Sequence, residues 1–150
     1  MYSNNKKQIL KKFILEFFTP TGNKRKNSGN ELNYLHSTLD RVFIQNFGFN
    51  LDRAIVATTF TKLGFQVFQM NSTFNSETKR VVPSKDGEFN DMSTNGSKRF
   101  EAPFTYFDIS PVTVRLLMKT TAKLSDNTNE SKKIETRNMK QKIEELKKRL

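Results

Sequence analysis

The chain has no cysteine, no tryptophan and a single histidine among its 150 residues. Without cysteine it has no disulfide, thiolate zinc site, iron–sulfur cluster or cysteine nucleophile. One histidine excludes zinc sites built on two or three histidines, and it leaves His36 as the single candidate base of a Ser-His-Asp triad. His36 follows Leu35 on the apolar side of a predicted helix, so we expect a core or half-buried side chain and not a ligand.

Sequence patterns for phosphate or metal binding are also missing. The six glycines are scattered and form no glycine-rich phosphate loop. The acidic run at residues 86–91 lacks the Gly and Glu of a calcium-binding EF-hand loop, since Asp91 and Ser97 occupy those positions. We therefore predict a protein that is not an enzyme, with no metal, no other cofactor and no small-molecule substrate.

Long apolar runs are absent as well. No window approaches the roughly 18 apolar residues of a membrane-spanning helix, and Glu16 interrupts the apolar start of the chain before any cleavage pattern. We expect a protein of the cytoplasm or of a virion. Residues with AT-rich codons (Phe, Tyr, Met, Ile, Asn, Lys) number 62, against 22 with GC-rich codons (Gly, Ala, Arg, Pro), which favours a phage, mobile-element or organelle origin.

Positive charge is present in excess and is unevenly distributed. The net charge is +11, of which residues 1–29 carry +6 and residues 125–150 carry +3. The intervening residues 30–124 are close to neutral. This distribution predicts three parts: a basic amphipathic N-terminal helix and loop (1–29), a neutral globular body (30–124), and a linker with a C-terminal amphipathic helix (125–150).

Hydrophobic periodicity predicts five helices. Apolar residues recur at helical spacing in residues 5–18 and 31–47, and the second of these helices has Asn30 as its expected N-cap. Asn50 is the expected cap of a third helix over 51–63, although its β-branched run leaves a hairpin of 54–60 with 65–70 as the alternative. Ser110 and Pro111 start a fourth helix, and residues 132–150 form the fifth.

Two segments in the middle of the chain have strand character. Residues 65–70 alternate apolar and polar side chains, and residues 99–107 form a return strand that Pro103 confines to an edge or bulge. The polar excursion at 71–98 between them is a small β-meander or a mobile segment, with short strands near Val81, Val82 and Phe89. The predicted fold is α+β, in the order α-α-α-β-(excursion)-β-α-α. The expected core comprises Leu35, Leu39, Phe43, Ile55, Phe60, Leu63, Val67, Phe104, Leu117 and Leu124.

Basic side chains supply the first functional hypothesis, which is non-specific binding of the DNA or RNA backbone, within a nucleoprotein assembly. Solvated helix faces and a solubilising loop remain the alternative interpretation of the same residues. A membrane surface beneath the apolar side of helix 5–18 is a weaker possibility. The candidate residues are Lys6, Lys7, Lys11, Lys12, Lys24, Arg25 and Lys26 at the N-terminus, and Lys79, Arg80, Lys98 and Arg99 on the excursion.

A second hypothesis is a structural or assembly subunit of a phage particle or other large complex. The apolar stripe of the C-terminal helix must be covered by the body, by a second copy of the chain or by another protein, and the polar linker favours an intermolecular contact. The candidate partner-binding residues are Met139, Ile143, Leu146 and Leu150.

A third hypothesis comes from element order. Two helices joined by a short Gly-containing turn and followed by a β-hairpin have the order of a winged helix-turn-helix protein. The second of those helices, residues 51–63, would then enter the major groove of DNA, and the excursion would be the wing. Three features argue against this interpretation: helix 51–63 has only two basic residues and much apolar surface, the preceding helix is long, and the excursion is large for a wing. An ordinary α+β core is the alternative. The side chains available for contacts are Arg53, Thr58, Thr59, Thr61 and Lys62.

Overall fold

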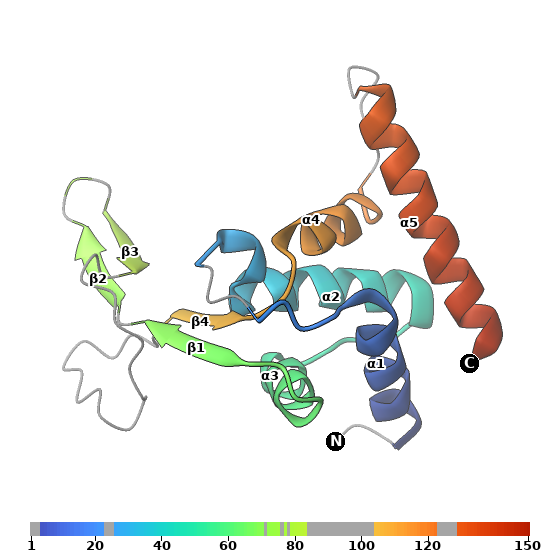
Figure 1. Ribbon diagram of the computed structural model, residues 1–150, viewed down its shortest axis with the longest axis horizontal. Helices are drawn as coiled ribbons and strands as arrows, with labels where there is room; N and C mark the ends of the chain where they lie inside the picture. Colours follow the sequence, from blue (N-terminus) through green and yellow to red (C-terminus); the bar gives the residue numbers. More distant parts are fainter. Residues whose placement is uncertain are drawn as a thin grey trace.

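The computed structural model describes residues 4–22, 26–70, 72–75, 77, 79–83, 104–122 and 129–150. The described part contains five α-helices and two small antiparallel sheets. The predicted α+β class and the order of its elements are confirmed (Figure 1). The elements are α1 (Asn4–Phe17), the 3-10 turn η1 (Ser28–Asn30), α2 (Leu32–Phe47), α3 (Arg53–Lys62), β1 (Val67–Met70), β2 (Ser72–Asn75), β3 (Arg80–Pro83), β4 (Phe104–Phe107), α4 (Pro111–Lys119) and α5 (Glu130–Arg149).

The start of α2 differs from its prediction. Its N-cap is Glu31, whose side chain accepts a hydrogen bond from the backbone N–H of Asn33 at 3.0 Å. Asn30 is instead buried in η1, and its side-chain amide donates to the backbone carbonyl of Phe107 at 2.8 Å. Local sequence rules assign the Asn30 side chain to capping α2. In the structure it makes a long-range hydrogen bond to β4 instead.

The other helix boundaries follow local rules more closely. The third predicted segment is a helix and not a hairpin, but its N-cap is Asp52, two residues after the expected Asn50. Gly48 ends α2 in the left-handed conformation with φ 77°, which a residue without Cβ adopts at no steric cost. Ser110 caps α4 as predicted by accepting from the N–H of Thr113.

The four described strands form two separate antiparallel pairs. β1 pairs antiparallel with β4, and β2 pairs antiparallel with β3. An isolated bridge between Glu31 and Tyr106 adds the connection between α1 and α2 to the other edge of β4. The strand expected near Val81 and Val82 is β3, and the other predicted features of the excursion, including Phe89, lie outside the described residues. In Figure 1 the β2–β3 pair extends away from the helices.

The core is built largely from aromatic and aliphatic side chains of the helices. Leu35, Leu39, Phe43, Phe60 and Leu117 are each fully buried, as predicted. Ile55, Leu63 and Phe104 are half-buried, and Leu124 lies outside the described residues. Val67 is 38% exposed and was wrongly placed in the core, because Phe68 and Met70 face inward from β1 instead.

The N-terminal helix belongs to this core. Its apolar side contributes Leu10, Phe13, Ile14 and Phe17 to the same buried cluster as α2 and α4. The ring of Phe13 packs edge-on against that of Phe43, with centroids 5.0 Å apart. The apolar face considered for a membrane surface is therefore covered by protein, and no described helix is long and apolar enough to cross a bilayer.

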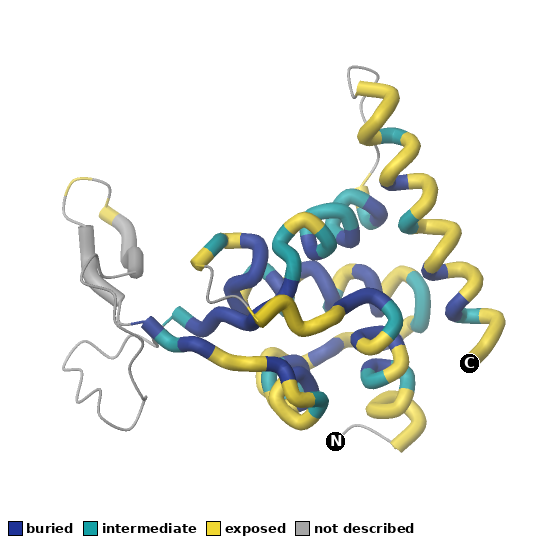
Figure 2. Tube along the Cα trace, viewed as in Figure 1, coloured by how far each residue is buried: buried dark blue, intermediate teal, exposed yellow. Residues whose placement is uncertain are grey.

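The C-terminal helix also packs on the body. Ile143 and Leu146 of α5 are buried in the main core cluster, and the remaining faces of the helix are largely exposed (Figure 2). The amino group of Lys142 lies 4.7 Å from the ring centroid of Phe17. Of the three possible covers for the stripe, the body itself covers Ile143 and Leu146, which corrects the preference for an intermolecular contact at these two candidate residues. Met139 is half-buried and Leu150 is 43% exposed.

Candidate functional site

A hollow between α1 and α3 brings together basic residues from two parts of the sequence. Its volume is about 240 Å³. We call it the basic hollow, and it is lined by Asn4, Lys7, Gln8 and Lys11 of α1 and by Ile55, Thr58, Thr59 and Lys62 of α3.

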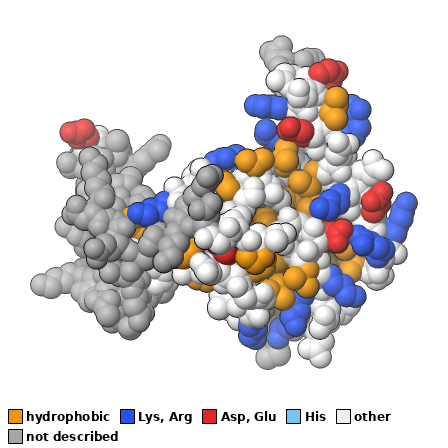
Figure 3. All heavy atoms as spheres, viewed as in Figure 1, with side chains coloured by type: hydrophobic (Ala, Val, Ile, Leu, Met, Phe, Trp, Pro, Cys, Tyr) orange, Lys and Arg blue, Asp and Glu red, His pale blue; other side chains and the backbone are white. Residues whose placement is uncertain are grey.

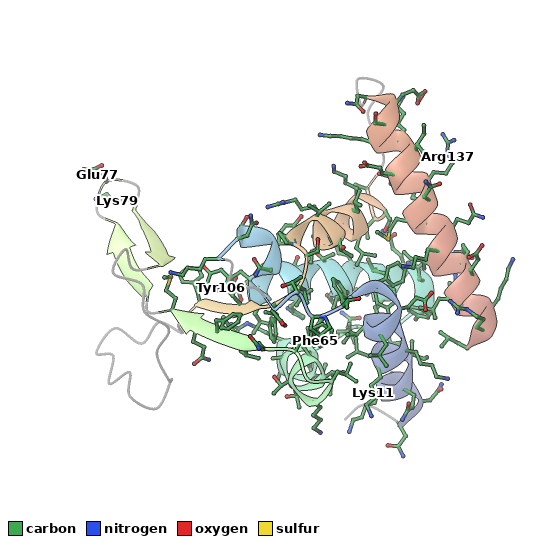
Figure 4. All side chains as sticks on the ribbon, in the orientation of Figure 1. Lys11, Phe65, Glu77, Lys79, Tyr106 and Arg137 are labelled. Carbon is green, nitrogen blue, oxygen red and sulfur yellow. The ribbon has the colours of Figure 1, made fainter. Side chains whose placement is uncertain are left out.

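The spacing of these residues explains why they meet. On each helix the four lining positions follow the pattern i, i+3, i+4, i+7, which places them on one side of an α-helix. The opposite side of α1 is held in the core by its apolar residues, so its polar side is turned outward next to α3. In Figure 4 Lys11 lies on α1, near α3. The fold therefore sets Lys7 and Lys11 beside Lys62.

The basic hollow carries positive charge. Within the described part of the chain, its lining contains three lysines and no carboxylate. Among the same residues, Lys7, Lys11 and Lys62 make no ion pair. In Figure 3, Lys and Arg side chains gather at the lower edge of the molecule, over α3 and the adjoining part of α1. Cations grouped in this way raise the local concentration of anionic ligands.

A second and larger hollow, of about 530 Å³, lies on the other side of α3. We call it the sheet-side hollow. It shares Thr58 and Lys62 with the basic hollow, so the exposed surface of α3 stands between the two. Its described lining has an apolar part and a polar part, and the polar part contains two cations and no carboxylate. The lining residues are Leu32, Ala57, Val67 and Phe107, with Arg53, Thr58, Thr61, Lys62, Gln69 and Thr105.

The other N-terminal basic residues that the structure describes lie outside the basic hollow. The amino group of Lys6 lies 5.2 Å from the ring centroid of Phe49, and Lys12 lines a hollow between α1 and α5. Lys26 is exposed in the connection before η1. Of the seven candidates, only Lys7 and Lys11 enter the basic hollow, while Lys24 and Arg25 lie outside the described residues.

The two described candidates on the excursion, Lys79 and Arg80, lie away from this site (Figure 1). Lys79 is exposed at the turn between β2 and β3, well away from Lys11 in Figure 4. Arg80 lies on β3, and Lys98 and Arg99 lie outside the described residues.

The buried acidic and histidine side chains have structural partners. His36 is half-buried, as predicted, with Nε2 2.6 Å from the carbonyl oxygen of Leu51. Glu31 accepts from two backbone amides, those of Asn33 and Thr105. Burial first, and the Glu31 carboxylate second, raise the pKa of Tyr106 above its ordinary value. No group of three or more potential metal ligands occurs within the part of the chain that the structure describes.

Sequence reasoning found most of these residues but kept them in separate hypotheses. Lys7 and Lys11 were assigned to a basic arm, whereas Thr58 and Lys62 were assigned to a possible DNA-reading helix. Asn4 and Gln8 were missed, although the helical spacing that relates them to Lys7 and Lys11 is visible in the sequence. Comparisons with protein families, curated proteins and solved structures gave no match to this chain.

Proposed function

We propose that the chain binds the phosphate backbone of nucleic acid through the basic hollow. The observation that carries this proposal is the convergence of Lys7, Lys11 and Lys62 in one hollow whose described lining includes no carboxylate. Lysine ammonium groups release condensed counterions when they neutralise phosphates, which favours binding at low salt. Neighbouring Asn, Gln and Thr side chains can donate further hydrogen bonds to phosphate oxygens.

The proposal changes the expected location of binding. The charge distribution suggested two basic arms beside a neutral body, but α1 packs in the core and its basic face is continuous with α3. Binding then depends on a folded surface and includes Lys62 from the segment counted as neutral. Deleting residues 1–29 is consequently a poor test, because it also removes core residues such as Phe13.

Point substitution of α1 tests the proposal directly. We expect the double variant Lys7→Gln/Lys11→Gln to bind mixed-sequence DNA more weakly and with a smaller salt dependence. Each lost phosphate contact reduces the slope of log K against log salt concentration by about 0.9 on duplex DNA, so two contacts predict a change of about 1.8. Fluorescence anisotropy of labelled DNA across a salt series measures both quantities.

A matched control separates position from net charge. Lys132 and Lys140 are exposed on α5 and line none of the hollows described above. The variant Lys132→Gln/Lys140→Gln therefore removes the same charge and should retain the original slope. Equal losses in the two double variants would show that overall charge, and not the basic hollow, governs binding.

The assembly role stays a prediction with less to support it. It was based on apolar stripes of the terminal helices, and α1 and α5 direct most of those residues into the core of the same chain.

A further inference from the structure

The exposed surface of α3 forms a ridge between two hollows. Helical geometry puts Ala54, Thr58 and Thr61 on the outward side of α3. Ala54 lines neither hollow, Thr58 lines both, and Thr61 lines the sheet-side hollow. Ala54 and Thr58 are exposed, as is Thr61. We infer that this ridge enters the major groove of double-stranded DNA, with one sugar–phosphate backbone at each hollow. The inference rests on the proposed function and specifies its substrate as duplex DNA.

Dimensions support this arrangement. An α-helix with its side chains is about 10–12 Å in diameter, and the major groove of B-DNA is about 12 Å wide. A helix fits there only if the protein on both sides of it recedes to make room for the two backbones. The hollows on either side of α3 supply that room, and the small side chains Ala54 and Thr58 allow close approach.

Charge is available on both flanks of the ridge. Lys7 and Lys11 face the side of the basic hollow, Arg53 faces the sheet-side hollow, and Lys62 reaches both. Asp52, the N-cap of α3, is followed by a helix that contains no acidic residue. A duplex seated on α3 would therefore meet cations along both strands, as phosphate positioning requires.

The arrangement of α2, α3 and the strands that follow them agrees with insertion of α3 into the major groove. In Figure 1, α2 runs across the view and α3 is seen nearly end-on, so the two successive helices cross. The Glu31–Tyr106 bridge places the α1–α2 connection beside β4, and β1 follows directly after α3. Helix, crossing helix and antiparallel pair recur in this order in helix-turn-helix proteins with a wing.

Sequence discrimination by this ridge should be weak. The outward side presents an alanine and two threonines, and the Thr61 hydroxyl already donates to the carbonyl of Ala57 at 2.9 Å. The strongest base readers, Arg, Asn and Gln in bidentate contact with purines, do not occur at these three positions. Backbone contacts then dominate affinity, and shape selects duplex over single strand.

The test uses the full chain and three labelled DNAs: a mixed-sequence duplex, its separated strands, and the same duplex with glucosylated 5-hydroxymethylcytosine. The added sugar occupies the major groove, because position 5 of a pyrimidine lies at that groove's edge. We expect binding to the unmodified duplex to exceed binding to either other DNA by at least tenfold. Equal affinity for modified and unmodified duplex, or for single strands, would overturn the inference.

A substitution on the ridge provides an independent test. Ala54→Phe adds bulk at an exposed position that lines neither hollow, and we expect it to weaken duplex binding at least tenfold. Ala122→Phe, at an exposed position after α4, is the matched control and should bind normally. If Ala54→Phe binds duplex normally while Lys7→Gln/Lys11→Gln does not, the groove inference is wrong and backbone binding stands. If the lysine variant also binds normally, the proposed function itself is wrong.

Discussion

The carboxylate of Asp108 accepts a hydrogen bond from the backbone N–H of Gln66 at 2.9 Å. Its other oxygen accepts from the N–H of Gly22 at 3.3 Å. Asp108 is 1% exposed and follows β4, so one buried side chain ties the segment after α1 to the residues before β1. This side chain helps to hold the α1 segment against the segment that leads from α3 into the sheet.

We expect Asp108→Ala to lower the free energy of unfolding by about 1.5–3 kcal/mol for each hydrogen bond to the charged group that it removes. Asp108→Asn keeps an acceptor oxygen and should lose less. Urea denaturation followed by circular dichroism measures these differences. Glu135→Ala, at an exposed position on α5, should change stability by less than about 0.5 kcal/mol. Unchanged stability of Asp108→Ala would show that these bonds contribute nothing to the fold.

Gly29 is required by a close approach between η1 and the start of α4. A Cβ added at Gly29 would lie 2.7 Å from the Cβ of Pro111, which is shorter than such atoms can approach. We expect Gly29→Ala to destabilise the protein by about 1–3 kcal/mol, as overpacking does elsewhere. The thermal unfolding midpoint measures the loss, with Ser28→Ala at the exposed neighbouring position as the control. An unshifted midpoint for Gly29→Ala would mean that η1 and α4 separate without cost.

Local patterns in the sequence identified the elements of this fold because those patterns act over a few residues. Helical periodicity located α1 and α2, and the Ser110-Pro111 pair located the start of α4. The errors arose where distant contacts compete with local rules. Asn30 bonds to the carbonyl of Phe107 instead of capping α2, and the partners that bury Phe68 instead of Val67 come from β4, far along the chain.

The candidate site could be predicted only in halves. Each half is a set of residues at i, i+3, i+4 and i+7, all polar on α1 and polar except for Ile55 on α3, which is a local signal in the sequence. Nothing local shows that the half on α1 faces the half on α3, because the core packing of Phe13 and its neighbours sets that placement. Only the α3 part of the sheet-side hollow had a signal in the sequence, since the hollow also includes Gln69 of β1 and Thr105 of β4.

The attachment of α5 depends on apolar packing more than on charge. Ile143 is 2% exposed in the core, whereas the ion pair of Arg149 with Glu16, at 2.9 Å, lies at the surface. We expect Ile143→Ala to cost about 2–5 kcal/mol of unfolding free energy and Arg149→Gln to cost at most about 1 kcal/mol. Chemical denaturation measures both. Equal and small effects, together with a change in sedimentation mass for Ile143→Ala, would instead indicate that α5 packs on another molecule.

Because of the Tyr106 phenol, the free energy of unfolding should decrease at alkaline pH. Burial, and then the nearby Glu31 carboxylate, raise the pKa of the Tyr106 phenol above its ordinary value. As the pH rises above about 10, the unfolded chain releases this proton while the folded chain still holds it. The contribution is therefore complete below pH 10 and is lost as the pH rises toward the folded-state pKa.

The variant Tyr106→Phe isolates this contribution, because it removes the titrating hydroxyl and leaves every lysine in place. We expect the unfolding free energy of the wild type to fall relative to that of Tyr106→Phe between pH 9 and pH 11, by up to about 1.4 kcal/mol per pH unit above pH 10. Urea denaturation at intervals of half a pH unit measures the difference. A difference that stays constant across this range would show that the phenol titrates equally in the folded and unfolded chains.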